Sequence, residues 1–320
     1  MANLNVAVFG PTGYGKDIGK KGTSTDITFY NLKKGDDTAT LIEPTRYPER
    51  LAPLFYAASM ADLAILVVDK LDNLFGERLL MLDCLGVRKG LIVLRNYIMP
   101  DQIAPLLAGT VAEGYEMAED DPNAIRETLL SKARALELPT PEDAGGAVPI
   151  DHHFNVKGVG TVILGSVAKG AIRKHDKLKV LPLKEVATLR SIQKHDDDAD
   201  SAVEGERVGL ALKGIESDRL DRGFVLSTDD SLKVVERVEA RARLVKYWPS
   251  AMKEDMVVHL GHWMQVVPCR IEKVDNGEDW RAPLLTLALE KELIHSPGDR
   301  GVLIYLEGGK LRIAGTIDLP

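Results

Sequence analysis

Residues 148–165 read Val148-Pro-Ile-Asp-His-His-Phe-Asn-Val-Lys-Gly158-Val-Gly-Thr-Val-Ile-Leu-Gly165, and this stretch decides the fold of the second half of the chain. It contains β-branched runs joined by a glycine-rich turn, and similar short runs separated by glycines follow at close intervals. Many short strands with even spacing are typical of a β-barrel or a β-sandwich. The chain after Val148 is therefore predicted to be all-β.

The residues before this stretch follow a different pattern, in which apolar, strand-like runs alternate with segments of helical spacing. Two of the runs, 63–68 and 90–94, are apolar throughout, as expected of parallel strands that are covered on both faces. The predicted strands are 5–9, 27–30, 38–42, 63–68 and 90–94, and helices are predicted at 48–59, 74–85 and over much of 100–137. Strands that alternate with helices predict an α/β layer with a parallel sheet.

Two turn-rich segments divide the chain. Pro139-Thr-Pro-Glu-Asp-Ala-Gly-Gly146 is a connector, and Ser227-Thr-Asp-Asp-Ser231 marks a second, softer boundary. Beyond it, short strands are predicted at 238–245, 256–260, 264–274, 284–289, 301–305 and 311–317. We therefore predict an α/β domain over 1–147, a first β-barrel over 148–229 and a second β-barrel over 230–320.

The composition is that of an ordinary soluble protein, with 45% hydrophobic and 28% charged residues among 320. No apolar run approaches the ~20 residues of a membrane span, and the start lacks the pattern of a secretory signal. Two cysteines far apart in sequence predict neither a disulfide framework nor a zinc site, so we expect a protein of the reducing cytoplasm. We also expect a monomer. The net charge of −7 weighs against a nucleic-acid binder, although a local basic face can bind a backbone even in an acidic chain.

A glycine-rich segment after the first strand carries the chemistry of phosphate binding. Gly10-Pro-Thr-Gly-Tyr-Gly-Lys16 matches the phosphate-loop pattern, in which backbone N–H groups and the lysine wrap the phosphates and a following Ser or Thr holds magnesium. Here Asp17 stands in place of that hydroxyl, and Gly19 shortens the helix whose N-terminus supplies anion affinity. Two interpretations stay open: a glycine turn without a ligand, or a weak nucleotide site formed by Gly10, Gly13, Gly15, Lys16 and Asp17.

The stretch 148–165 closely resembles the opening of the second domain of translational GTPases. Further residues match that domain at its usual spacings: Gly170, Asp176, Pro182, Arg190-Ser-Ile-Gln193, His195-Asp196, Gly205-Glu-Arg207-Val-Gly209 and Arg222-Gly223. The chain is most similar to SelB and the archaeal SelB-like elongation factors, with initiation factor two gamma and EF-Tu slightly further away. The resemblance implies a P-loop GTPase-like domain followed by two β-barrels. It also implies a translation elongation factor of protein biosynthesis that binds GTP or GDP with Mg²⁺, aminoacyl-tRNA and the ribosome.

The resemblance also locates the nucleotide motifs, and four of them are altered. Ser24 stands where the family has a metal-binding threonine. In Glu43-Pro-Thr-Arg-Tyr47, which replaces Asp-x-Pro-Gly-His, Tyr47 takes the place of the histidine that orients the attacking water. Ile98 stands where a carboxylate would pair with guanine, so guanine specificity and the cofactor itself are in doubt. Hydrolysis tolerates little error in the position of its nucleophile, so we predict weak or lost GTPase activity and assign no catalytic residue.

In the second domain the resemblance places a cleft for the aminoacylated end of tRNA around Asp151, Phe154, His195 and Arg207. Phe154 is a candidate to stack on a base, and Arg207 to contact phosphate or ribose. The alternatives are a core aromatic and an arginine paired with an acid inside the barrel. The histidines of this region lack metal-site spacing, so no metal site is predicted.

Two functions remain open from the sequence. The first is an elongation factor that carries aminoacyl-tRNA with little or no GTP hydrolysis. The second is a binding protein derived from the same superfamily that acts through protein or ribosome contacts. If the chain is an enzyme, it is a GTPase, but the altered motifs argue against efficient turnover.

Overall fold

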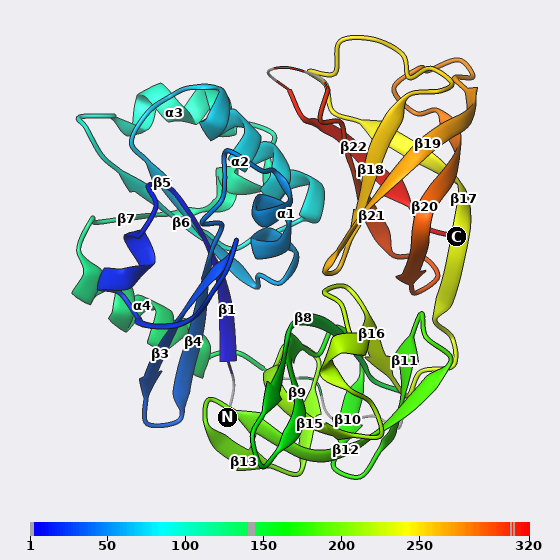
Figure 1. Cartoon of the computed structure of the whole chain (residues 1–320). Coiled ribbons are helices and arrows are strands. Elements are labelled where there is room, and N and C mark those ends of the chain that lie inside the picture. Colours follow the sequence, from blue (N-terminus) through cyan, green and yellow to red (C-terminus); the bar gives the residue numbers. More distant parts are fainter. Residues whose placement is uncertain (1–2, 138, 140–144, 308, 310) are drawn as a thin grey trace. The chain divides into compact units, whose positions relative to one another are not determined.

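The computed structural model describes residues 3–137, 139, 145–307, 309 and 311–320. The chain divides into two compact units, Met1–Leu138 and Pro139–Pro320, which are described separately (Figure 1). Most of the connector predicted at 139–146 lies outside the described residues. None of the helices in the described part of the chain is long and apolar enough to cross a membrane.

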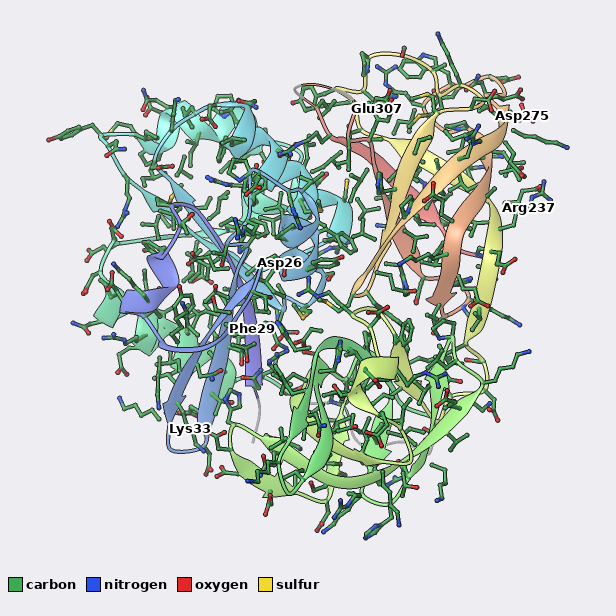
Figure 2. All side chains as sticks on the ribbon, viewed as in Figure 1. Asp26, Phe29, Lys33, Arg237, Asp275 and Glu307 are labelled. Carbon is green, nitrogen blue, oxygen red and sulfur yellow. The ribbon has the colours of Figure 1, made fainter. Side chains whose placement is uncertain are left out.

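The first unit is built on a seven-stranded sheet of order β2-β3-β4-β1-β5-β6-β7. The strands are β1 Asn3–Phe9, β2 Lys20–Ser24, β3 Thr28–Lys34, β4 Asp37–Glu43, β5 Leu63–Val68, β6 Gly90–Leu94 and β7 Glu116–Ala118. From β4 across to β7 the neighbouring strands are parallel, whereas β2 and β3 form an antiparallel edge. Strands β1, β5 and most of β6 are buried on both faces, which explains their continuous apolar sequences. Along β3, Phe29 is buried whereas Lys33, near the turn to β4, is exposed (Figure 2).

Helices cover both faces of this sheet. On one face, helix α4 (Pro122–Arg134) forms a core with alternate residues of the central strands through Ile125, Leu129 and Ala133. Helix α1 (Ala52–Ser59) also contacts β1 and β4. The helices are α1 Ala52–Ser59, α2 Asn73–Leu85, α3 Pro100–Leu107 and α4 Pro122–Arg134, with 3₁₀ turns η1 Tyr14–Asp17 and η2 Val111–Gly114. The five strands predicted before residue 100 match β1, β3, β4, β5 and β6, whereas β2 was not predicted. The predicted helical region 100–137 is interrupted by η2 and β7. The α/β layer positions the loops after β1, β4, β6 and β7 at one edge of the sheet, since these strands run parallel.

The second unit begins with a closed six-stranded barrel of order β11-β16-β8-β9-β15-β12, in which β12 pairs back to β11. Its strands are β8 Ala147–Val156, β9 Gly160–Ser166, β11 Lys177–Leu181, β12 Glu185–Lys194, β15 Arg207–Lys213 and β16 Val225–Ser227. Three short strands and a 3₁₀ turn lie outside this circuit: β10 Ala171–Arg173, β13 Asp197–Ala199, β14 Ser201–Val203 and η3 Ser217–Arg219. Alternate apolar residues of each strand fill the interior, with Ile163 and Leu210 among those fully buried.

A second closed barrel follows, of order β17-β20-β19-β18-β21-β22. Its strands are β17 Lys233–Leu244, β18 Val257–His262, β19 Gln265–Asp275, β20 Leu284–His295, β21 Arg300–Ile304 and β22 Ile313–Asp318. Figure 2 labels Arg237 on β17 and Asp275 at the end of β19. The three tryptophans of the chain, Trp248, Trp263 and Trp280, all belong to this barrel segment. An α/β sheet domain followed by two β-barrels confirms the predicted fold class.

Candidate functional site

The phosphate-loop segment Gly10–Lys16 follows β1, as predicted, but no α-helix follows it. In its place stands the four-residue turn η1, which starts after Gly13 in the left-handed conformation (φ 87°). Arg126 of α4 ties down the end of this turn, because its Nε donates to the Ile18 carbonyl at 2.8 Å and its Nη2 to the Asp17 carbonyl. The loop therefore lacks the helix N-terminus that supplies much of the anion affinity of a working phosphate loop. Lys16 and Asp17 are exposed.

A carboxylate of the protein itself lies in the phosphate loop. Glu43, at the end of β4, accepts a hydrogen bond from Gly13 N on Oε1 and one from Gly15 N on Oε2, the latter 3.1 Å long. The side chain is almost fully buried, at 4% exposure. Burial raises the pKa of Glu43, while the two N–H donors and the charge of Lys21 oppose that shift. Amides that would bind a phosphate are thus bonded to an internal carboxylate.

The ring of Tyr30 lies directly against the loop. A Cβ added to Gly15 would lie 2.6 Å from Tyr30 Cδ2, so glycine is required there by packing. Burial raises the pKa of the Tyr30 hydroxyl, and the negative charges of Glu43 and Asp17 raise it further. Tyr30 was not predicted as a site residue, since a tyrosine in a strand carries no signal for which loop it supports.

Tyr47, which replaces the water-orienting histidine, contacts α2. Its side chain is buried, and its hydroxyl lies 2.9 Å from Glu77 Oε2 and 3.2 Å from the Leu74 carbonyl. Arg78 lies over the Tyr47 ring, 5.6 Å from its centroid, and donates to the Gly10 carbonyl at 3.3 Å. The Tyr47 hydroxyl is therefore engaged with α2 residues and holds the segment after β4 in place.

Ser24, expected in place of a metal-binding threonine, belongs to strand β2 at the edge of the sheet. Its hydroxyl lies 2.9 Å from that of Thr28, which in turn lies 2.6 Å from the hydroxyl of Thr45. The segment that contains Ser24 is therefore part of a β-hairpin, since Ser24 pairs with Thr28 across β2 and β3.

A cluster of polar side chains joins the segments that follow β1, β6 and β7. Arg95, after β6, makes two hydrogen bonds to the Asp120 carboxylate, of 2.6 and 3.0 Å, and its guanidinium lies 5.1 Å from the centroid of the Tyr14 ring. Tyr14 also donates to Asp120 Oδ1 at 3.1 Å. Burial and the Asp120 charge raise the pKa of Tyr14. Asp120 and Tyr14 escaped prediction, because 106 residues separate these partners.

The side chains of this site do not fit a magnesium nucleotide. Asp17 replaces the metal-binding hydroxyl, the Ser24 hydroxyl is bonded to Thr28, and the Gly13 and Gly15 amides are bonded to Glu43. Among the residues that the structure describes, no group of three or more His, Cys, Asp or Glu side chains is arranged to hold a metal ion.

In the first barrel, the predicted tRNA-cleft residues Asp151 and Arg207 form a buried ion pair. Arg207 Nη1 lies 2.7 Å from Asp151 Oδ2, and Nη2 lies 3.1 Å from Oδ1. His152 Nδ1 lies 2.6 Å from Asp151 Oδ1, and Arg222 donates to the Asp151 carbonyl at 3.2 Å. Burial alone raises the pKa of Asp151, but Arg207 and His152 outweigh it and lower the pKa to about 2. The buried pair joins β8 to β15.

The other two cleft residues lie on two different hairpins. Phe154, near the β8–β9 turn, is 38% exposed, and its ring is nearly parallel to that of His152, with an angle of 8° and a centroid distance of 6.1 Å. Val156 and Val159 of the same hairpin are also exposed. His195 lies at the tip of the β12–β13 hairpin, with φ 48°. The structure thus brings Asp151, Phe154 and Arg207 onto β8 and β15, and places His195 just after β12, the strand that pairs with β15.

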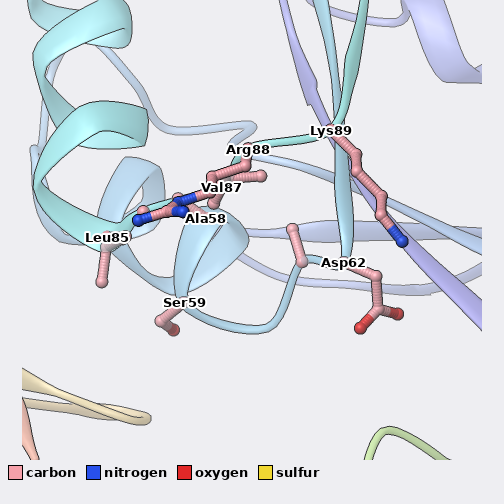
Figure 3. A pocket seen from close by; sticks show the side chains of 9 residues that line it. Ala58, Ser59, Asp62, Leu85, Val87, Arg88 and Lys89 are labelled. Atoms are coloured by element: carbon pink, nitrogen blue, oxygen red, sulfur yellow. The ribbon is translucent and has the colours of Figure 1, made fainter. Parts of the chain in front are cut away.

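A further cavity, of about 270 Å³, lies at the amino-terminal ends of β5 and β6, away from the phosphate loop (Figure 3). Asp62 and Lys89 are near neighbours there, and Asp62 accepts hydrogen bonds from the backbone and side chain of Asn5 at 2.8 and 3.1 Å. None of the site residues predicted from the sequence lines this cavity.

The sequence of the chain is similar to those of several known proteins. The model of elongation factor Tu domain 2 matches residues 160–227. The uncharacterized protein MJ0325 of Methanocaldococcus jannaschii is 40% identical over 318 residues, which cover 99% of each chain. The selenocysteine-specific elongation factor of the same organism is 25% identical over 373 residues, covering 98% of this chain and 79% of that protein.

Among solved structures, the elongation factor SelB of Methanococcus maripaludis in complex with the GTP analogue GppNHp has the same fold. Its TM-score is 0.83 at 24% identity, over 100% of this chain and 79% of SelB. The full-length match at 40% identity shows that the chain belongs to one family with MJ0325. The chain is a SelB/EF-Tu-like relative of the translational GTPases.

Proposed function

We propose that this protein is a cytoplasmic translation factor that binds the acceptor end of aminoacyl-tRNA and acts at the ribosome without efficient GTP hydrolysis. The observation that carries the proposal is the exposed Phe154 on the β8–β9 hairpin, in a barrel that matches elongation factor Tu domain 2.

The surface around Phe154 has the chemistry of a single-stranded RNA contact. An aromatic ring that offers a face to a base contributes about 1–3 kcal/mol of stacking per base, whatever the base. Lys157 on the same hairpin is exposed, and Arg190 reaches the hairpin by donating to the Val159 carbonyl at 3.2 Å. Two cations beside an aromatic ring suit a terminal nucleotide and its phosphate.

The position of the Tyr47 side chain supports the proposal that GTP hydrolysis is inefficient. The attacking water must be held in line with the scissile bond, and small displacements of the positioning group cost large factors in rate. The Tyr47 hydroxyl is buried against Glu77 and Leu74 of α2. We expect no phosphate release from GTP above that of a protein-free control.

The RNA proposal is tested by fluorescence anisotropy with labelled aminoacyl-tRNA, at moderate salt and without added nucleotide. Phe154→Ala should weaken binding by roughly 5- to 150-fold, the equivalent of one lost stack. Val186→Ala, which truncates another exposed apolar side chain of the same barrel, serves as the matched control and should bind like the natural protein. Equal affinity of the Phe154→Ala and Val186→Ala variants would contradict the stacking role.

A second candidate function is a binding protein that uses protein or ribosome contacts and no tRNA. The Asp151–Arg207 pair favours it, because the two buried charges are bonded to each other rather than offered to RNA. The same anisotropy experiment separates the two: no tRNA binding by the natural protein, together with cosedimentation with ribosomes, would support the second candidate against the first.

A further inference from the structure

The carboxylate of Glu43 meets the phosphate loop as a phosphate group would. Its two oxygens accept from two different amides, Oε1 from Gly13 and Oε2 from Gly15. Alternate backbone N–H groups that converge on oxygens of one anion form the concave arrangement by which phosphate loops bind phosphates. The loop is thus already bonded to an anion that belongs to the chain.

The topology of the sheet places the Glu43 carboxylate beside the phosphate loop. Strands β1 and β4 are parallel neighbours, with Ala7 opposite Ile42, so the residue after Ile42 ends β4 just where β1 runs into the loop. Glu43 is also almost fully buried, next to the Tyr30 ring that packs on Gly15. The contact is therefore part of the packed structure and not a surface contact that solvent can replace.

We propose that Glu43 is the resident ligand of the phosphate loop: it occupies the anion site of the Gly13 and Gly15 amides, keeps the loop closed without nucleotide, and excludes phosphate groups from it. The inference goes beyond the proposed function, because it concerns the first unit alone and holds whether or not the barrels bind RNA.

The exclusion has two physical causes. An incoming phosphate must first break two hydrogen bonds between amides and a charged acceptor, which are stronger than those between neutral groups. It must also approach a buried carboxylate whose negative charge repels it, and Asp17 adds a second negative charge beside the loop. A site that is open for only a small fraction of the time has an apparent affinity lowered by that fraction.

The experiment uses the full chain labelled with ¹⁵N, and inorganic pyrophosphate as the probe. In the natural protein, pyrophosphate should leave the Gly13 and Gly15 amide signals unchanged. In Glu43→Ala the same signals should shift in a saturable way, with an affinity at least about tenfold above that of the natural protein. Glu127→Ala is the control, because it removes one negative charge from an exposed carboxylate of the same unit that pairs with Lys34. It should not bind.

Each result decides the matter. Saturable shifts of Gly13 and Gly15 in the natural protein, or a folded Glu43→Ala variant that binds no better than Glu127→Ala, would overturn the inference. Should Glu43→Ala lose its folded first unit, amide hydrogen exchange gives an independent answer. The Gly13 and Gly15 amides should exchange slowly in the natural protein with or without pyrophosphate, and at least about tenfold faster in Glu43→Gln, which keeps the shape but not the charge. Equal exchange rates in the two proteins would also overturn it. The readout involves no RNA, so its failure would leave the tRNA proposal standing.

Discussion

Replacing Arg207 by methionine removes the guanidinium that neutralises a carboxylate with no exposed surface. The side chains of Asp151 and Arg207 are 0% and 11% exposed. Removing one partner of a buried pair costs about 3–5 kcal/mol, because the other charge stays buried without compensation. The pKa of Asp151, lowered to about 2, gives a second estimate. Relative to an ordinary aspartate near 3.9, it corresponds to roughly 2–3 kcal/mol at neutral pH. Taking the two estimates together, we expect Arg207→Met to destabilise the first barrel by about 2–5 kcal/mol.

Hydrogen exchange followed by mass spectrometry is the suitable assay, on peptides that cover β8 and β15. Tryptophan fluorescence is unsuitable, since all three tryptophans lie in the last barrel segment. The pH dependence has a defined sign. The pKa of Asp151 is lower in the folded than in the unfolded state, so its contribution is complete above about pH 5 and is lost as the pH falls toward 2. The difference in stability between the natural protein and Asp151→Asn should therefore shrink below about pH 4.

The matched control is Arg190→Met, which removes an exposed arginine of the same barrel and should change the opening free energy by less than about 0.5 kcal/mol. The double variant Asp151→Asn/Arg207→Met should be more stable than the sum of the two single effects predicts, since it leaves no unpaired charge. If Arg207→Met matches Arg190→Met, the pair is not structural, and Arg207 returns as a candidate for an RNA contact.

Three further outcomes follow from the packing. Gly15→Ala should destabilise the first unit by about 1–3 kcal/mol in urea unfolding, because the new methyl group would overlap the Tyr30 ring; a neutral effect would mean that this ring moves freely. Asp72→Ala should lower the stability of the first unit by about 0.5–2 kcal/mol, since Asp72 caps α2 by accepting from Leu74 N and Phe75 N. Thermal unfolding measures this loss, and an unchanged midpoint would show that the cap contributes nothing to stability. Cys269 should resist alkylation at pH 8 in the folded protein, because burial raises the pKa of its thiol to about 12; rapid modification would show that the last barrel opens readily.

Local signals were enough to predict the barrels. In 148–165, β-branched runs flank glycines, and in the structure Gly158 and Gly160 adopt positive φ values of 82° and 95° in the β8–β9 turn. Short strands with weak patterns were missed, as β7 shows: three residues cannot display a period, and its pairing with β6 comes from tertiary structure alone.

The sequence also revealed which site residues are altered, but not what they do instead. Glu43, Tyr47 and Ile98 stand out against the family motifs, yet no sequence pattern indicates that the Glu43 side chain turns toward Gly13, 30 residues earlier, or that Tyr47 turns toward Glu77. Such contacts depend on the register of β1 against β4 and on where α2 packs, and both are set by the whole sheet.

The bond between the phosphate loop and Glu43 is intramolecular, and this has a consequence for how the protein would work in a cell. A ligand carried on the same chain has a fixed effective concentration, independent of the nucleotide pool. A loop held this way requires no exchange factor to reload it and has no spent product to discard. It also cannot time a step by hydrolysis, because no bond is cleaved in the contact between Glu43 and the loop. Any cycle of binding and release by this protein would have to be driven by its partners.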